Sequence, residues 1–304
     1  MSASISNSLT LRNPTHSGLT DAQIRNFAPS VFTDHARSNM SDRYQFVPTY
    51  ELLAEMRQQG FVPTEVQVYN RKIPEYRPYA MHLIRFSEPG AKGTLKVVGD
   101  TAPQIIMRNS HDGSSLLELY NGVFRLVCAN GLVVSDSSAV QPVRVKHASN
   151  PVLEAMFVVQ ELASRTKAVF EHIDAMRATP MTEKQQLSFA REALKLHAGV
   201  SVIDPAAMLG NVRRPEDKGN DVWHVFNRIQ EHLVRGGLEG VTAANRRTVT
   251  RGTATMYRQL EVNAALWTLA MDAIGHASDS SRSAVRALAK ATAIDAEFTE
   301  TVLA

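Results

Sequence analysis

Hydrophobic and polar residues alternate in the first half of the chain at the spacing of β-strands. Val62, Val66 and Val68 alternate with polar residues, and the run from Met81 to Phe86 alternates again. Successive side chains of a strand point to opposite faces of a sheet, so a period of two predicts half-buried strands. A brief apolar piece, Lys96 to Val98, extends the series. The pattern predicts a meander of mostly antiparallel strands.

The densest apolar stretch runs from Gln104 to Val134 and is divided by a polar loop, Ser110 to Ser115. Apolar runs flank the loop on both sides, so it is predicted to join two antiparallel strands. The Asn-Gly pairs at Asn121–Gly122 and Asn130–Gly131 predict further tight turns. The segment Val123 to Cys128 suits a buried strand better than a glycine-capped helical turn.

One short helix is predicted before these strands, from Tyr50 to Gln59. Leu52, Leu53 and Met56 recur there at helical spacing, with Thr49 as the expected cap and Gly60 as the stop.

After Asn150–Pro151 the apolar period changes to three and four residues, which is typical of amphipathic helices. Thr182 and either Asn220 or Asp221 stand where N-caps are expected. The glycines at 236, 237 and 240 fit helix termination and depart from nucleotide-binding patterns. The predicted helices are Val152–Ala178, Glu183–His197, Asp221–Arg235, Thr255–Ile274 and Ser283–Leu303.

These patterns predict an α+β fold, with a mostly antiparallel sheet and a short helix followed by a helical half packed on it. The predicted divisions are an N-terminal arm (1–43), a β-rich half (44–150), a helical half (151–276) and a C-terminal helical tail (277–304). Leu9 and Leu11 are the residues of the arm expected to dock as a strand. The tail is either a helix for homo-oligomerisation or a loosely docked appendage.

Composition narrows the class of protein further. With 304 residues, 44% of them hydrophobic and 21% charged, the chain is expected to be globular. A net charge of +3 does not by itself require a nucleic-acid partner. The single cysteine, Cys128, excludes an internal disulfide and a multi-cysteine zinc site. The sequence has no apolar run near the ~20 residues that cross a bilayer, so a soluble, cytoplasmic protein without membrane contact is predicted.

Two blocks of the sequence resemble a known family. NSHDGSSLLELYNGVFRLVCANGLVV and RRPEDKGNDVWHVFNRIQEHLVRGG look like the phage/plasmid-like family filed as domain of unknown function 932, and RGTATMYRQLEVNAALW is similar to the closing helix of that family. The resemblance covers roughly Tyr44 to Gly275. It implies carriage on phages, plasmids and other mobile elements, and it brings no established activity, catalytic residue or cofactor.

The first candidate site is the polar loop. Its residues are Asn109, Ser110, His111, Asp112 and Ser114. They include the residue types of a nucleophilic triad, but neighbours in one loop rarely align as nucleophile, base and orienting group, so no catalytic residue is assigned. The functional interpretation is a hairpin tip that binds an anion such as phosphate, and the structural alternative is an Asx-type turn.

Metal binding by the loop is a weaker alternative. It would require His82, Asp112 and His147 to converge on His111, and no spacing of metal ligands supports this. No metal or cofactor is therefore expected.

The second candidate site is a set of basic and amide residues in the helical half. Between Gly240 and Gln259 no acidic residue offsets the arginines. Guanidinium groups hold phosphates in bidentate fashion, and amides can pair with bases. The alternative is structural use in ion pairs and buried polar networks. The set comprises Arg213, Arg214, Asn227, Gln230, Arg235, Arg246, Arg247, Arg251 and Arg258.

Three functions follow from these patterns. The leading hypothesis is a non-enzymatic, nucleic-acid-associated protein of a mobile element that binds single-stranded DNA through residues 246–258, with the His111 loop as a second candidate contact. The second is a protein-interaction module that inhibits a host defence or restriction factor. The third is a metal-dependent hydrolase or nuclease that uses His111 and Asp112.

Overall fold

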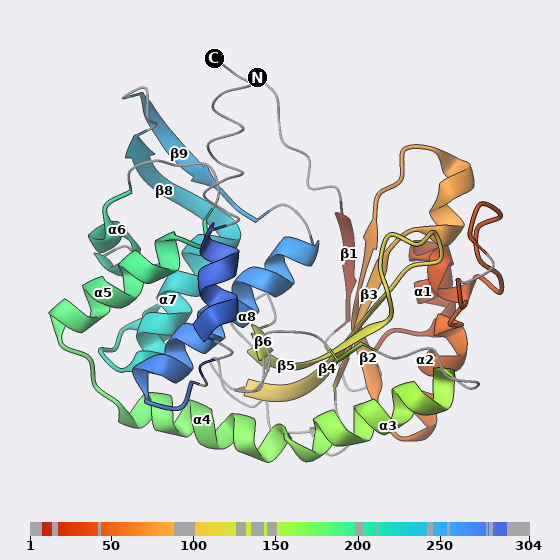
Figure 1. Ribbon diagram of the computed structural model, residues 1–304, viewed down its shortest axis with the longest axis horizontal. Coiled ribbons are helices and arrows are strands. Elements are labelled where there is room, and N and C mark those ends of the chain that lie inside the picture. The colour runs from red at the N-terminus through yellow and green to blue at the C-terminus, as the bar shows by residue number, and fades with distance from the viewer. Residues whose placement is uncertain are drawn as a thin grey trace. The chain divides into compact units, whose positions relative to one another are not determined.

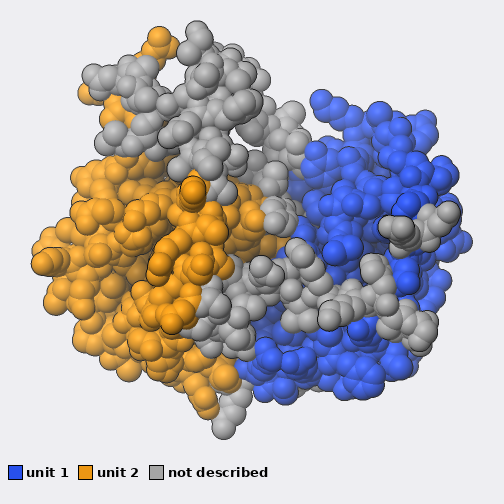
Figure 2. Space-filling model, in the orientation of Figure 1, with its two compact units in different colours: residues 1–133, 142–166 blue, residues 134–141, 167–304 orange. Residues whose placement is uncertain are grey.

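The computed structural model describes residues 8–13, 18–41, 44–87, 101–125, 132–134, 143–144, 151–197, 203–210, 212–241, 246–253, 256–277, 279 and 282–290. The predicted features at Lys96–Val98, Cys128, Asn130–Gly131 and His147 lie outside these residues. The chain forms two compact units, residues 1–133 with 142–166 and residues 134–141 with 167–304 (Figure 2). In the described residues, no helix has the length and apolar character needed to cross a membrane.

Unit 1 is built on a sheet in which the strands follow the order β1-β2-β3-β4-β5-β6, with β7 also paired to β5 (Figure 1). The pairings from β1 through β5 are all antiparallel. With the helices of both units, this confirms the predicted α+β fold. The strands are β1 (Ser8–Arg12), β2 (Val62–Tyr69), β3 (His82–Ser87), β4 (Thr101–Asn109), β5 (Glu118–Arg125), β6 (Leu132–Val134) and β7 (Val143–Arg144).

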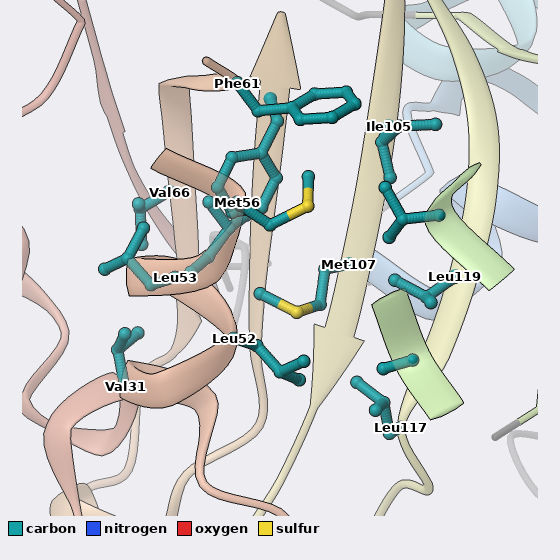
Figure 3. Close-up of a cluster of buried hydrophobic side chains, with 14 of the residues drawn as sticks. Val31, Leu52, Leu53, Met56, Phe61, Val66, Ile105, Met107, Leu117 and Leu119 are labelled. Carbon is teal, nitrogen blue, oxygen red and sulfur yellow. The ribbon is translucent and has the colours of Figure 1, made fainter. Parts of the chain in front are cut away.

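One face of this sheet is covered by α1 (Asp21–Phe27), the 3-10 helix η1 (Pro29–Phe32), α2 (Thr49–Gln58) and α3 (Pro151–Ser164). The side chains between them form a single hydrophobic cluster, because alternate strand residues point toward the helices. Figure 3 shows Leu52 and Met56 of α2 facing Ile105 and Met107 of β4.

The N-terminal residues contribute more to this core than the predicted arm suggests. β1 pairs with β2 as expected, with Leu9 opposite Val68. Ile24 and Val31, however, are fully buried in the hydrophobic cluster. A capping box between Thr20 and Gln23 starts α1. The sequence signal was therefore present locally, but the helix is too short for its apolar period to be visible.

Two local predictions in unit 1 are wrong. Thr49 is not the cap of α2, because the N-cap is Pro48 and the Thr49 hydroxyl makes buried contacts with histidines instead. Asn121–Gly122 is not a turn. Both residues lie inside β5, where Asn121 is paired with Ile105 of β4, because the strand pairing continues across the glycine.

The predicted long helix Val152–Ala178 is also wrong, since the structure contains two helices that meet at Arg165. These are α3 and α4 (Thr166–Ala178). The Ser164 hydroxyl donates to the Glu161 carbonyl at 2.7 Å, a local hydrogen bond that competes with the helical pattern. The chain passes from unit 1 to unit 2 at this break.

Unit 2 is mainly helical and is centred on α7 (Val222–Arg235), whose predicted apolar stripe is buried. Phe226 of α7 meets Trp267 edge-on, with ring centroids 6.1 Å apart. The caps at Thr182 and Asp221 are confirmed, each accepting a backbone N–H from its first turn. The remaining elements are α5 (Glu183–Leu194), α6 (Pro205–Gly210), the 3-10 helix η3 (Pro215–Asp217) and α8 (Met256–Ala273), and residues 282–290 are helical.

A two-stranded hairpin in unit 2 was not predicted from the helical pattern. It consists of β8 (Gly236–Val241) and β9 (Arg247–Arg251), paired antiparallel. Gly236 ends α7 as expected, but the chain continues from it directly into a strand. The signal that could have revealed the hairpin is the Thr-Val-Thr run of β9, because β-branched residues favour strands.

Gly236 allows this helix-to-strand junction. Its φ of +69° lies in the left-handed region, and a Cβ at this position would approach the Arg251 carbonyl carbon to 2.5 Å. We expect Gly236→Ala to lower the free energy of unfolding by at least about 3 kcal/mol, because strain and a backbone clash add.

Gly275→Ala is the matched control for Gly236→Ala. Gly275 has a φ of +77°, and a Cβ there would meet no described atom within 4 Å. Gly275→Ala should therefore lower the free energy of unfolding only by the cost of backbone strain, about 1–2 kcal/mol. Urea unfolding measures both values, and equal costs would contradict the close packing of the hairpin against the end of α7.

Candidate functional site

The outer face of β9 presents two exposed arginines of the predicted basic set. The burial pattern along the strand alternates, so that Arg247, Val249 and Arg251 are exposed while Thr250 is buried. The buried Thr250 hydroxyl accepts the backbone N–H of Leu238 at 2.9 Å, which fixes the orientation of the strand against β8. The two guanidinium groups therefore lie on one face of a hairpin that is held in place from behind.

A pocket of about 620 Å³ lies beside this face. Its lining combines the side chain of Arg247 with the carboxylates of Asp204 and Glu239 and with Val249. Glu239 stands opposite Val249 in the β8–β9 register. One end of the hairpin surface is thus of mixed charge, whereas Arg251 lies at the other end, opposite Gly236.

Four other predicted arginines are engaged with acceptors inside unit 2. Arg214 binds the buried carboxylate of Glu231 through two nitrogens, at 3.0 and 3.1 Å, and Arg235 lies 3.5 Å from the same carboxylate. Arg213 donates to the Gly236 carbonyl. Arg258 donates to the Leu196 carbonyl at 3.1 Å and lies 3.4 Å from Glu261. These contacts give the four side chains structural roles.

The predicted amide contacts to bases are not available on the surface. Asn227 is 2% exposed and donates to the Trp223 carbonyl at 2.6 Å. Gln230 donates to Asn263 of α8 at 2.7 Å, and both side chains are buried. Trp223 is buried as well and stacks on Phe226. Asn227 and Gln230 thus belong to a buried polar network, which is the structural alternative given above for these residues.

The polar loop between β4 and β5 is also mostly internal. Ser110 and His111 are 0% exposed. The Ser110 hydroxyl accepts the backbone N–H of Ser115 at 2.8 Å and donates to its carbonyl at 3.0 Å. An anion in solvent cannot reach the hydroxyl or the imidazole without opening the loop, so the geometry favours the turn.

Asp112 supports the same interpretation, because its carboxylate is the acceptor of an Asx-type turn. One oxygen accepts the backbone N–H of Ser114 at 3.0 Å and the Ser114 hydroxyl at 2.5 Å, and the other is paired with Arg71. Burial raises the pKa of Asp112, but the hydrogen bonds from Ser114 and the charge of Arg71 outweigh it, so the pKa lies below its usual value.

His111 belongs to a buried hydrogen-bonding cluster with residues of α2 and β3. The Thr49 hydroxyl lies 2.9 Å from Nε2 of His82 and 3.4 Å from Nε2 of His111. Asn109 donates to the same hydroxyl at 3.0 Å. Burial lowers the pKa of His82 to about 3 and that of His111 to about 4, so both imidazoles are neutral at pH 7.

The sheet carries a group of ion pairs that was not predicted from the sequence. On the face opposite the hydrophobic cluster, Glu65 accepts from Arg12 at 2.6 Å and lies 3.5 Å from Arg85. Arg108 pairs with Glu118 on the neighbouring strands. Each pair brings an acidic and a basic residue directly opposite each other on neighbouring strands, so finding it requires the strand register.

Metal binding finds no support within the described part of the chain. There, no group of three or more His, Cys, Asp or Glu side chains is placed to hold an ion. The weaker alternative of a metal-bound loop therefore has no structural basis in these residues.

Comparison with known proteins assigns the chain to a family. Residues 36–267 match the family described as "Domain of unknown function (DUF932)". The chain belongs to this family. The DUF932 region contains the β8–β9 hairpin, the buried histidine cluster and the α2–α3 helix pair.

Two relatives from Escherichia coli (strain K12) extend the comparison. UPF0380 protein YfjQ is 33% identical over 254 residues, which cover 83% of this chain and 90% of that protein. UPF0380 protein YafZ is 32% identical with the same coverage. No solved structure matches the chain.

The buried histidines predict a dependence of stability on pH. In the unfolded chain both take up protons near pH 6.5, whereas in the folded chain they do so only near pH 4 and 3. The unfolded state therefore binds more protons below pH 6.5, and the contribution of these residues to stability is complete above that pH and is lost as the pH falls toward 4. Urea unfolding of the wild type should show this fall, and His111→Gln should reduce its slope. An unchanged slope in the variant would contradict the buried neutral state of His111.

Proposed function

We propose that this DUF932 protein binds nucleic acid through the outer face of the β8–β9 hairpin. The observation that carries the proposal is the exposure of Arg247 and Arg251 on one face of β9, while Arg213, Arg214 and Arg235 are engaged elsewhere. The hairpin strands carry the two exposed arginines Arg247 and Arg251 and the carboxylate Glu239, and Asp204 lies beside the Arg247 end. The charge of Arg247 is therefore partly offset by these carboxylates, whereas Arg251 lies at the other end of the strand, opposite Gly236.

The spacing of the two arginines suits contact with more than one phosphate. They are four residues apart along a strand, which corresponds to about 13 Å. A nucleic-acid backbone presents several phosphates over that length. Val249, which is 54% exposed, lies between them and offers an apolar surface to a sugar or base. A two-stranded ribbon is also an element that fits the major groove of a duplex.

This arrangement supports binding by charge more than reading of sequence. Residues 236–251 contain no aromatic side chain on which a base could stack. The amides of Asn227 and Gln230 are buried. We therefore expect weak dependence on sequence and strong dependence on salt. The proposal keeps single-stranded DNA as the expected ligand, and the association with a mobile element comes from the family resemblance.

The test is a fluorescence anisotropy titration of labelled oligonucleotides with the full chain and with Arg247→Ala/Arg251→Ala. The double variant should bind roughly tenfold more weakly near 100 mM salt, because two charged hydrogen-bond donors are lost. Its slope of log K against log salt should be shallower by about 1.4 for a single strand or about 1.8 for a duplex. Parallel titrations of both forms identify the preferred substrate.

Lys184→Ala/Arg191→Ala is the matched control, because it removes two exposed positive charges from α5. It changes net charge by the same amount and leaves the hairpin intact. The proposal predicts that the control binds like the wild type. If both variants lost affinity equally, the loss would reflect net charge and not the hairpin, which would contradict the proposal. Undetectable or salt-insensitive binding by the folded wild type would also overturn it.

A further inference from the structure

The helix α3 of unit 1 is apolar on two of its faces. One face, with Ala155, Val159 and Leu162, is buried in the hydrophobic cluster over the sheet. A second face carries Leu153, which is 53% exposed, and Phe157, which is 64% exposed. A helix that is apolar on more than one side is typical of a helix covered on more than one side.

The two exposed residues act as one surface because of their spacing. Leu153 and Phe157 are four residues apart, so their side chains are neighbours on the helix. Phe157 is also the most exposed large hydrophobic side chain in the described part of the chain. Single exposed apolar residues are common, but a neighbouring pair beside a groove marks an interaction site.

The pair borders a groove between α2 and α3, two helices of unit 1 that contact each other. The groove has a volume of about 400 Å³. Its apolar lining comes from α3 and includes Met156, whose flexible thioether adapts to different partners. Its polar lining consists of Glu51, Glu55 and two glutamines.

The charged side chains that line the groove are acidic. Among the described residues no basic side chain lines it, and Arg57, on the same helix as Glu51 and Glu55, is paired with Asp21 at 2.8 Å. The surface therefore offers apolar anchoring residues beside a negative rim. A complementary partner presents apolar side chains beside positive ones.

We propose that the α2–α3 groove is a docking site for a short amphipathic helix of another protein, with apolar anchors and a Lys- or Arg-rich edge. Two helices in contact leave a groove between them, and an amphipathic helix can fill such a groove with apolar residues spaced three and four apart. Leu153 and Phe157 would contact its apolar stripe, and Glu51 and Glu55 would contact its basic edge.

The same charges argue against other occupants. In a symmetric contact between two copies, Glu51 and Glu55 would face the same carboxylates, and like charges oppose such a contact. Phosphates of a nucleic acid or an anionic lipid would be repelled for the same reason. The groove is therefore a surface for protein, separate in chemistry from the arginines of β9.

The test uses two synthetic helical peptides, one with a Leu stripe flanked by Lys and one with the same stripe flanked by Glu. Isothermal titration calorimetry with the full chain should detect binding of the Lys peptide and at least tenfold weaker binding of the Glu peptide. Leu153→Ser/Phe157→Ser should weaken binding of the Lys peptide at least tenfold. Glu51→Lys/Glu55→Lys should reverse the preference between the peptides.

Ile73→Ser/Leu116→Ser is the matched control, because it removes two exposed apolar side chains elsewhere in unit 1. It should bind the Lys peptide like the wild type. All substitutions are at exposed or partly exposed positions, and unchanged thermal unfolding verifies that each variant is folded.

Three outcomes would overturn the proposal. The first is failure of the folded wild type to bind the Lys peptide, and the second is equal loss of binding in the groove variant and the control. The third is a wild-type dimer in sedimentation velocity that becomes a monomer in Leu153→Ser/Phe157→Ser, since the occupant would then be a second copy of the chain. None of these results depends on whether the β9 arginines bind nucleic acid.

Discussion

The close backbone contact between the end of α7 and the end of β9 is the constraint on which the candidate nucleic-acid surface depends. A Cβ at Gly236 would meet the backbone of residues 250–252, and a Cβ at Gly252 would lie 2.5 Å from the Val234 carbonyl oxygen. Thr253 donates its backbone N–H to that carbonyl at 2.9 Å. The two glycines thus let a strand start where a buried helix stops, so the hairpin is anchored to the core of unit 2 at its base.

Around this anchored hairpin, the arginines of the predicted basic set fall into two groups. One group, Arg213, Arg214 and Arg235, contacts acceptors within unit 2. Glu231 binds Arg214 closely and Arg235 more distantly, and Arg213 donates to the Gly236 carbonyl. A buried carboxylate requires such partners, because leaving it unpaired costs several kcal/mol. The other group, Arg247 and Arg251 of β9, faces outward, because strand alternation places both residues on the side opposite Thr250. The same residue type therefore has two roles within one segment.

The sequence predicted the elements whose signals are local and repeated. The period of two in β2 and β3, the stripe of α7 and the caps at Thr182 and Asp221 are all confirmed. Features that depend on tertiary partners could not be predicted in the same way. The role of Thr49 depends on His82, and Asn121–Gly122 is held in a strand by β4.

The candidate functional sites show the same difference between local signals and tertiary contacts. Composition identified the basic segment but could not show which arginines face carboxylates, since Arg214 and Glu231 are 17 residues apart. Composition also could not show that α3 has a second, exposed apolar face. Apolar residues at helical spacing look the same in the sequence whether their face is buried or exposed. The pairing of oppositely charged residues across the sheet was readable only once the register was known. Local patterns thus identify candidates, and burial decides which of them can reach a ligand.

The central claim is that Arg247 and Arg251 of β9 contact phosphates, whereas Arg213, Arg214 and Arg235, which contact acceptors within unit 2, do not. NMR spectra of the arginine Nε–Hε groups, recorded as an oligonucleotide is added, test it directly. The account predicts that the signals of Arg247 and Arg251 shift together in proportion to bound oligonucleotide, and that the signal of Arg214 stays in place because Glu231 holds it. Shifts at Arg214 without shifts at Arg247 and Arg251 would contradict it, as would spectra unchanged at saturating oligonucleotide.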